Sequence, residues 1–104
     1  MEFMPNPIEF SWDKGNEDKN LTKHKVTNQE CEEAFLTYPA VVVPDIKHSI
    51  NESRYLLLGE TSFNRTLLII FTLRGNKVRV ISARDMGKKE RSLYEEKTKR
   101  NTKF

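Results

Sequence analysis

The sequence is poor in the residues that crosslink small domains or bind metals in them. Cys31 is the only cysteine, which excludes an intrachain disulfide and a cysteine-based metal cluster. The two histidines, His24 and His48, lie too far apart in sequence to suggest a metal site. We therefore expect no metal and no other cofactor, and a single free thiol is compatible with the cytoplasm.

Long hydrophobic segments are also missing. The longest apolar run, Leu67 to Phe71, is far shorter than the roughly 20 residues that a membrane helix needs. The N-terminus has no basic segment followed by an apolar one, as an export signal would have. These absences predict a cytoplasmic protein that does not act on a membrane.

Familiar catalytic motifs are absent as well: there is no phosphate-binding loop, no Gly-x-Ser-x-Gly and no His-Glu-x-x-His. What the chain does have is positive charge, with 18 Lys and Arg against 15 Asp and Glu and a net charge of +3. The basic excess lies after Arg74. Such a region indicates a polyanionic partner, such as nucleic acid, an acidic protein or an anionic membrane surface, although basic tails are often only solvated surface.

The chain has 104 residues, which suits one hydrophobic core and leaves no room for a second. Residues 1–7 contain two prolines and no periodic pattern, so we expect them to be loose. Residues 8–99 are predicted to form the domain, and residues 100–104 a basic tail.

Periodicity predicts the element order β-α-α-β-β-β-β-α, an α+β domain. Ile8, Phe10 and Trp12 alternate as in a short strand, and a weak helix is expected from Asp13, as its cap, to His24. A second helix follows, then strands at 40–43, 55–59, 66–73 and 77–83, and a charged helix from Asp85 or Gly87 to about Lys99.

The clearest local signal is a capping box at the start of the second helix. Thr27 and Glu30 can each accept the other's free backbone N–H, and Val26 precedes them at the spacing of a hydrophobic staple. One apolar face is predicted, formed by Cys31, Ala34, Phe35 and Tyr38. Cys31 is therefore interpreted as a packing residue and not as a nucleophile.

The run at 66–73 is apolar at nearly every position, as in a central strand covered on both faces, and Arg74-Gly75-Asn76 predicts a hairpin turn. In the strand after this turn, alternation places Val78, Val80 and Ser82 on one face and Arg79, Ile81 and Ala83 on the other. Arg79 would then need an anion, either Glu9, Asp45 or Glu60 in an ion pair or a phosphate.

Two further groups remain open in the same way. Lys23 and His24 end the first predicted helix, where a cation offsets the helix dipole and needs no further role, or where His24 can transfer protons. His48 lies in a polar loop and is expected to brace it by a hydrogen bond to Asp45 or Glu52.

Several motifs together resemble one known family. Phe10-Ser11-Trp12-Asp13, Lys23-His24-x-Val26 and the block from Arg79 to Arg84 are similar to the BrnT family, and the likeness extends from Phe10 to about Glu96. Lys25 stands where the family usually has Gly, so either a residue with a Cβ accepts strain in the left-handed position that ends the helix or the joint differs from that of the family. Asn64 replaces another frequent Gly and tolerates positive φ.

This resemblance implies a RelE-like ribonuclease that cleaves RNA. It also implies a BrnA-like ribbon-helix-helix antitoxin that holds the ribonuclease inactive and with which it binds operator DNA. Metal-free RNA cleavage needs a base, a cation at the phosphorane and an acid, all of which basic side chains can supply.

Within this resemblance, Arg79 and Arg84 are assigned to phosphate stabilisation, and Lys23 or His24 to proton transfer. The cations expected to grip RNA phosphates are Arg65, Arg74, Lys88, Lys89 and Arg91. A non-catalytic module that binds nucleic acid or an acidic protein stays open as the alternative, because a basic cleft binds RNA whether or not it cuts it.

Overall fold

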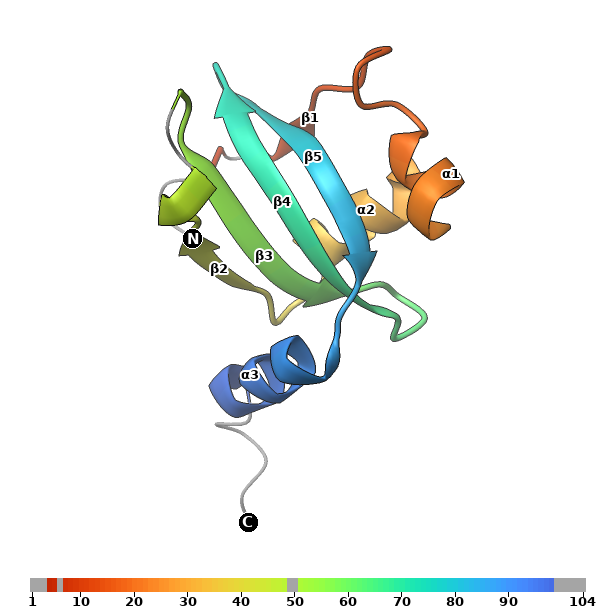
Figure 1. Ribbon diagram of the computed structural model, residues 1–104, viewed down its shortest axis with the longest axis vertical. Helices are drawn as coiled ribbons and strands as arrows, with labels where there is room; N and C mark the ends of the chain where they lie inside the picture. The colour runs from red at the N-terminus through yellow and green to blue at the C-terminus, as the bar shows by residue number, and fades with distance from the viewer. Residues whose placement is uncertain (1–3, 6, 49–50, 99–104) are drawn as a thin grey trace.

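The computed structural model describes residues 4–5, 7–48 and 51–98, with the side chain of His48 left out. In chain order the elements are β1 (Glu9–Phe10), α1 (Lys19–His24), α2 (Asn28–Leu36), β2 (Val41–Pro44), the 3₁₀ helix η1 (Ile46–His48), β3 (Arg54–Glu60), β4 (Thr66–Arg74), β5 (Lys77–Asp85) and α3 (Lys88–Thr98). The strands form one sheet in the order β1-β5-β4-β3-β2, antiparallel except where β1 runs parallel to β5 (Figure 1). The predicted α+β class and element order are confirmed.

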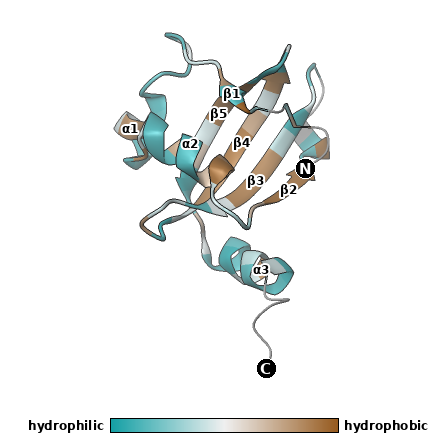
Figure 2. Cartoon of the chain, turned by 180° about the vertical axis from the view of Figure 1, so that it is seen from behind, coloured by the Kyte–Doolittle hydropathy of each residue, from teal (hydrophilic) through white to brown (hydrophobic). Residues whose placement is uncertain are grey.

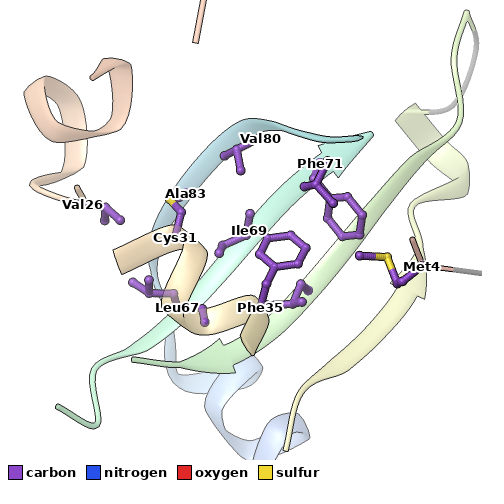
Figure 3. Packing of buried hydrophobic residues seen from close by; sticks show 12 residues of the cluster. Met4, Val26, Cys31, Phe35, Leu67, Ile69, Phe71, Val80 and Ala83 are labelled. Atoms are coloured by element: carbon purple, nitrogen blue, oxygen red, sulfur yellow. The ribbon is translucent and has the colours of Figure 1, made fainter. Parts of the chain in front are cut away.

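Helix α2 covers one face of the sheet, which we call the closed face (Figure 2). The predicted capping box is present: Thr27 Oγ1 accepts from Glu30 N at 3.0 Å, and Glu30 Oε1 accepts from Thr27 N at 2.9 Å. Cys31, Ala34 and Phe35 point from α2 onto the strands (Figure 3). Phe35 meets Phe71 edge to face, with 4.9 Å between the ring centroids, so the helix and the sheet share one aromatic core.

Gly59 allows α2 to approach the sheet closely. A Cβ at this position would lie 2.7 Å from the backbone oxygen of Ala34, a separation that real side chains do not reach. The glycine in β3 is therefore a packing requirement, as is common where a backbone comes near a strand.

The other face, which we call the open face, is covered only at one end. Helix α3 packs there through Tyr94, and Met86, in the connection before the helix, lies in the same cluster with Leu58 and Leu68. The rest of this face, toward the viewer in Figure 1, carries no helix among the described residues. Ile70, in the middle of β4, is consequently half-exposed. The prediction that β4 is covered on both faces therefore holds for one end of the strand only.

A β-bulge changes the predicted faces of β5. The register shifts between Ile70 and Phe71, which pair with Ser82 and Val80, so Ile81 is the extra residue. Val78 and Val80 lie on the closed face as predicted, but they share it with Ala83 and not with Ser82. The assignment of Ala83 to the face of Arg79 was wrong, because strict alternation fails across a bulge.

The N-terminal third differs most from prediction. Helix α1 begins at Lys19 and not near Asp13, and β1 spans two residues only. Tyr38 was expected on the apolar face of α2 but is 73% exposed, since the helix ends at Leu36. Met4, within the segment predicted to be loose, is buried in the core of the closed face.

None of the described helices is long and apolar enough to cross a membrane.

Candidate functional site

The segment before α1 runs along the free edge of β5 beyond its short pairing with β1. Asn16 and Asn20 are 2% exposed and replace a neighbouring strand. Asn16 Nδ2 donates to Val80 O at 3.1 Å, and Asn20 Oδ1 accepts from Ala83 N at 2.9 Å. These amides fix α1 beside the strand, so that its C-terminal end, with Lys23 and His24, lies near the end of β5 (Figure 1).

Arg79 forms an ion pair, but with a carboxylate that the sequence analysis did not consider. Its Nη1 and Nη2 lie 2.8 and 3.0 Å from the two carboxylate oxygens of Asp13, and the arginine side chain is only 13% exposed. The hydrogen bonds from Arg79 and from the backbone N–H of Gly15 lower the pKa of Asp13. The predicted partners Glu9, Asp45 and Glu60 were wrong.

Arg65 binds two carboxylates and two backbone oxygens. Its Nε donates to Asp85 at 2.7 Å, its Nη1 lies 3.1 Å from Glu30, and the two η nitrogens also reach the backbone oxygens of Lys25 and His24 at 2.8 and 3.4 Å. The bonds to the two carboxylates raise the pKa of Arg65. All three nitrogens of the guanidinium are bonded within the protein. Arg65 therefore links the start of β4 to β5 and to the helices α1 and α2, and we call this set of bonds the Arg65 clasp.

The turn that Arg65 holds contains the unusual Lys25. Its φ of 60° is left-handed, as expected from the residue that replaces the family's glycine. Lys25 N donates to Leu21 O, the bond of an αL C-cap, and Val26 N donates to Asn20 O. The strained residue therefore sits where Arg65 binds the chain, and Asn64, with φ 68°, adopts positive φ as predicted.

His24 and Lys23 lie beside the Arg65 clasp. His24 is half-buried and Lys23 is exposed. The pKa of Asp85 is lowered, first by its hydrogen bond from Arg65 and further by the charges of Arg91 and His24. The structure thus places His24 with Arg65 and Arg91 around one carboxylate, and Lys23 is the residue that precedes His24 in α1.

Arg84 points from the open face of β5 toward the start of α3. Its Nη1 lies 3.0 Å from Asp85 O and 3.5 Å from Glu90 Oε1, and its side chain remains 42% exposed. Glu90 also accepts from Gly87 N at 2.6 Å, which lowers the pKa of Glu90 and caps the helix. Lys88 and Lys89 are exposed on the first turn of α3.

The remaining predicted cation lies far from this group. Arg74 stands at the β4–β5 hairpin, with its Nη2 3.9 Å from Glu52 Oε1. It pairs with Lys77, and at about 3.3 Å per residue the seven residues from Lys77 to Arg84 span about 23 Å. The predicted site residues thus divide into a basic cluster at the C-terminal end of β5, the isolated Arg79–Asp13 pair and the distant Arg74. The basic cluster consists of Lys23, His24, Arg65, Arg84, Lys88, Lys89 and Arg91.

Cys31 is fully buried, and desolvation raises the pKa of its thiol to about 12. A protonated, inaccessible thiol agrees with packing and not with nucleophilic attack. No group of three or more metal-binding side chains occurs among the residues that the structure describes. The side chain of His48, expected to brace its loop, lies outside the described part.

Sequence reasoning missed the residues that hold the predicted cations in place: Asp13 at Arg79, and Asn16, Asn20, Glu30 and Asp85 around the cluster. Three had been given other tasks, Asp13 and Glu30 as helix caps and Asp85 as a possible start of the last helix, and Glu30 both caps its helix and binds Arg65. The only sequence signal for the asparagines is their spacing of four, which puts both on one side of a helical turn.

The fold is a small α+β domain with one open sheet face, and a cluster of basic side chains at the end of its central hairpin is the kind of surface that attracts polyanions. Residues 12–90 match the family described as "Ribonuclease toxin, BrnT, of type II toxin-antitoxin system". The chain therefore belongs to the BrnT family of ribonuclease toxins, as the sequence motifs suggested, and this family implies an RNA target and an antitoxin partner. No curated protein matches the chain.

Proposed function

We propose that the protein is a metal-independent endoribonuclease that cleaves RNA at the basic cluster. The main support is that His24 and Arg84 both act on Asp85 at the end of β5, His24 through its charge and Arg84 through a bond to the backbone oxygen, in a chain of a ribonuclease family. His24 or Lys23 transfers protons, and Arg84 stabilises the charge that develops on the phosphate. Lys88, Lys89 and Arg91 bind neighbouring phosphates from α3.

The reaction uses the RNA's own 2′-hydroxyl as nucleophile. A basic side chain removes its proton while the 2′-oxygen attacks phosphorus, and the bond between phosphorus and the 5′-oxygen breaks. A protonated side chain, acting as the general acid, donates its proton to the leaving 5′-oxygen. The products are a 2′,3′-cyclic phosphate and a 5′-hydroxyl, and the extra negative charge of the phosphorane is what a guanidinium stabilises.

The two arginines first assigned to phosphate stabilisation are not equivalent. Arg84 is 42% exposed and its contact to Glu90 is 3.5 Å long, whereas Arg79 is 13% exposed and held by two short bonds to Asp13. Five residues of strand, about 16 Å, separate them. Arg84 is thus the better candidate for the reacting phosphate, and Arg79 can bind only another phosphate, by exchange with Asp13.

Arg65 and Arg74 receive different roles from those expected of them. Arg65 is engaged with Asp85 and Glu30, so we propose that it positions His24 and does not grip RNA. Arg74 is exposed at the β4–β5 hairpin, where it binds an RNA phosphate far from the basic cluster.

The deciding experiment incubates purified protein with single-stranded RNA in the presence and absence of a chelator. New 5′-hydroxyl and cyclic-phosphate ends that survive the chelator are expected. Arg84→Ala should lower the cleavage rate by about 10²–10³, the usual cost of one stabilising donor, while Lys97→Ala, the loss of an exposed lysine elsewhere on α3, should not. RNA that is bound but never cut would support the alternative, a non-catalytic binding module.

Control of the ribonuclease falls to a BrnA-like ribbon-helix-helix antitoxin in this proposal. An acidic segment of the antitoxin would occupy the sites that phosphates use, and the complex would bind operator DNA through the antitoxin. The exposed positions of Lys88 and Lys89 support such a contact. Both proteins would meet in the cytoplasm.

Co-expression with the antitoxin is therefore expected to abolish growth arrest. Charge reversal at Lys88 and Lys89 should weaken the complex more at low salt than at high salt, because salt screens exposed charges. A complex that is indifferent to both changes would replace electrostatic inhibition with hydrophobic occlusion.

A further inference from the structure

Phe63 is an aromatic side chain that none of the roles above uses. It lies in the turn from β3 to β4 and is 89% exposed, the largest exposed fraction of any large hydrophobic side chain that the structure describes. Single exposed apolar residues occur on most protein surfaces, so exposure alone assigns no role. The turn that carries Phe63 and its place in the molecule are what set this ring apart.

Hydrogen bonds hold the backbone on both sides of the ring. Thr61 is 2% exposed, and its Oγ1 accepts from the backbone N–H groups of Phe63 and Arg65, each at 3.2 Å. Thr61 N in turn donates to Arg65 O at 2.9 Å. Glu33 of α2 accepts from Ser62 N at 3.1 Å and from Ser62 Oγ at 3.0 Å. The turn is thus tied to itself and to α2, and it presents the ring to solvent in a fixed place.

The same turn ends in the basic cluster. Arg65 follows Phe63 by two residues, and its guanidinium lies 2.7 Å from Asp85 and 3.4 Å from the backbone oxygen of His24. Figure 1 shows the β3–β4 turn protruding from the sheet at the end where β5 finishes. An exposed aromatic ring and a group of cations therefore share one end of the sheet.

We propose that Phe63 stacks on one unpaired nucleobase of the RNA substrate while the basic cluster binds the phosphates beside it. Proteins that bind single-stranded RNA combine a positively charged surface along the backbone with aromatic rings on which bases stack. Every base has a π-face, so this contact holds the strand without selecting its sequence. The inference rests on RNA being the ligand of the proposed function, but not on cleavage.

The surroundings of the ring favour a base over a protein partner. Ser62 and Asn64, on either side of Phe63, are polar and exposed. The turn therefore presents one ring between polar groups, whereas the centre of a protein interface is more apolar than the rest of the surface.

The test measures binding to a short 2′-O-methyl oligonucleotide, which lacks the attacking hydroxyl and cannot be cut. Phe63→Ala should weaken binding about tenfold, the usual effect of removing one stacked ring, and Phe63→Leu, which stays apolar, should weaken it nearly as much. Ile46→Ala is the matched control, because Ile46 is 82% exposed at the opposite end of β3. It should leave binding unchanged.

Two further measurements separate stacking from charge. The salt dependence of binding counts neutralised phosphates, so Phe63→Ala should leave its slope unchanged while Arg84→Ala should reduce it. An oligonucleotide of the same length and backbone but without bases should bind wild type and Phe63→Ala equally. Phe63→Trp should restore tight binding, and its fluorescence should fall on binding the strand with bases but not the strand without them. The wild type, whose only tryptophan is Trp12, is the control for that signal.

Binding by Phe63→Ala at the wild-type level would overturn the proposal, and so would an equal loss of affinity on the strands with and without bases. Weaker antitoxin binding by Phe63→Ala with unchanged RNA binding would assign the ring to the inhibitor and also overturn it. Cleavage of ordinary RNA by the wild type would in those cases leave the proposed function intact. Stacking on Phe63 without any cleavage would instead refute the ribonuclease and support the base contact.

Discussion

The two faces of the sheet differ in how completely other elements cover them. On the closed face, α2 and the N-terminal segment bury an apolar cluster in which Leu57, Leu67, Ile69 and Phe71 are almost inaccessible to solvent. On the open face, α3 covers one end only, and the uncovered part carries a hollow of about 210 Å³ lined by Asp45, Arg54, Ile70, Ile81 and Ser82. The same strands therefore supply stability through one set of side chains and leave part of the alternate set exposed.

This comparison teaches that the open face can change without loss of the fold. A sheet stabilised from one side leaves the other free to carry charge and half-exposed apolar groups, which a doubly covered sheet could not tolerate. The predictions below test how complete that separation is.

Adjacent isoleucines of β4 give the sharpest test. Ile69 is fully buried on the closed face and Ile70 is half-exposed on the open face. Ile69→Ala should lower the free energy of unfolding by about 3 kcal/mol, and Ile70→Ala by about 1 kcal/mol, because less apolar area is lost and no closed cavity forms. Urea denaturation followed by circular dichroism measures both. Equal losses of unfolding free energy would mean that the two faces contribute equally to stability, which would contradict the comparison.

The Arg65 clasp joins the layers at one end of the sheet and should have the next largest effect. Arg65→Met is expected to cost about 2 kcal/mol, because the carboxylates of Asp85 and Glu30 lose a charged donor. Lys97→Met, at an exposed site of α3, is the matched control.

The same variant should change the pH dependence of stability. Folding lowers the pKa of Asp85 below its ordinary 3.8, chiefly through Arg65, and that of Glu30 below 4.5, where burial is outweighed by the bonds from Thr27 and Arg65. Groups with a lowered pKa in the folded state stabilise it above their unfolded pKa and lose this contribution as the pH falls. The difference between wild type and Arg65→Met should therefore shrink below about pH 4. A constant difference would contradict the charge pairing.

A smaller effect is expected from Cys31 on the closed face. Cys31→Ser places a hydroxyl among apolar groups and should lower stability by about 1–2 kcal/mol while RNA cleavage is retained. Thermal unfolding and cleavage assays on the same sample measure the two quantities. A folded variant without activity would give the thiol a role in the reaction.

The smallest predicted effect is a gain in stability. Lys25 has φ 60°, so Lys25→Gly should raise the free energy of unfolding by about 0.5–1 kcal/mol, since relief of strain exceeds the greater flexibility of the unfolded chain. Asn64→Gly, at φ 68°, should gain less, because asparagine tolerates this conformation. Destabilisation by Lys25→Gly would show that the lysine side chain makes a contact worth more than the strain.

Local chemistry could be predicted from the sequence, and long-range pairing could not. The capping box at Thr27 depends on residues within one turn and was predicted correctly, and of the two alternatives for Lys25 the structure has the left-handed one. The bulge at Ile81 depends on how β4 and β5 align, and no residue type near it marks a bulge. The error in the faces of β5 follows from this alone.

The site residues show the same limit. Clustering of Lys23 and His24 with Arg84 was proposed from the family resemblance, but Asp13 lies 66 positions from Arg79, and nothing in either neighbourhood links them. Nothing in the sequence marks Asn16 and Asn20 for burial, because asparagine is mostly an exposed residue. The structure explains their burial, because the edge of β5 has backbone groups that no neighbouring strand satisfies and that these side chains bind.

The edges of the sheet have a consequence for the solubility of the isolated chain. Exposed strand edges are templates on which further chains pair and aggregate. Here Asn16 and Asn20 occupy the backbone groups of Val80 and Ala83 that an incoming strand would use. At the opposite edge β2 is four residues long and ends at Pro44, which has no N–H to donate. A copy without its antitoxin thus offers few free backbone groups with which another chain could pair, and we expect it to resist aggregation through its sheet edges.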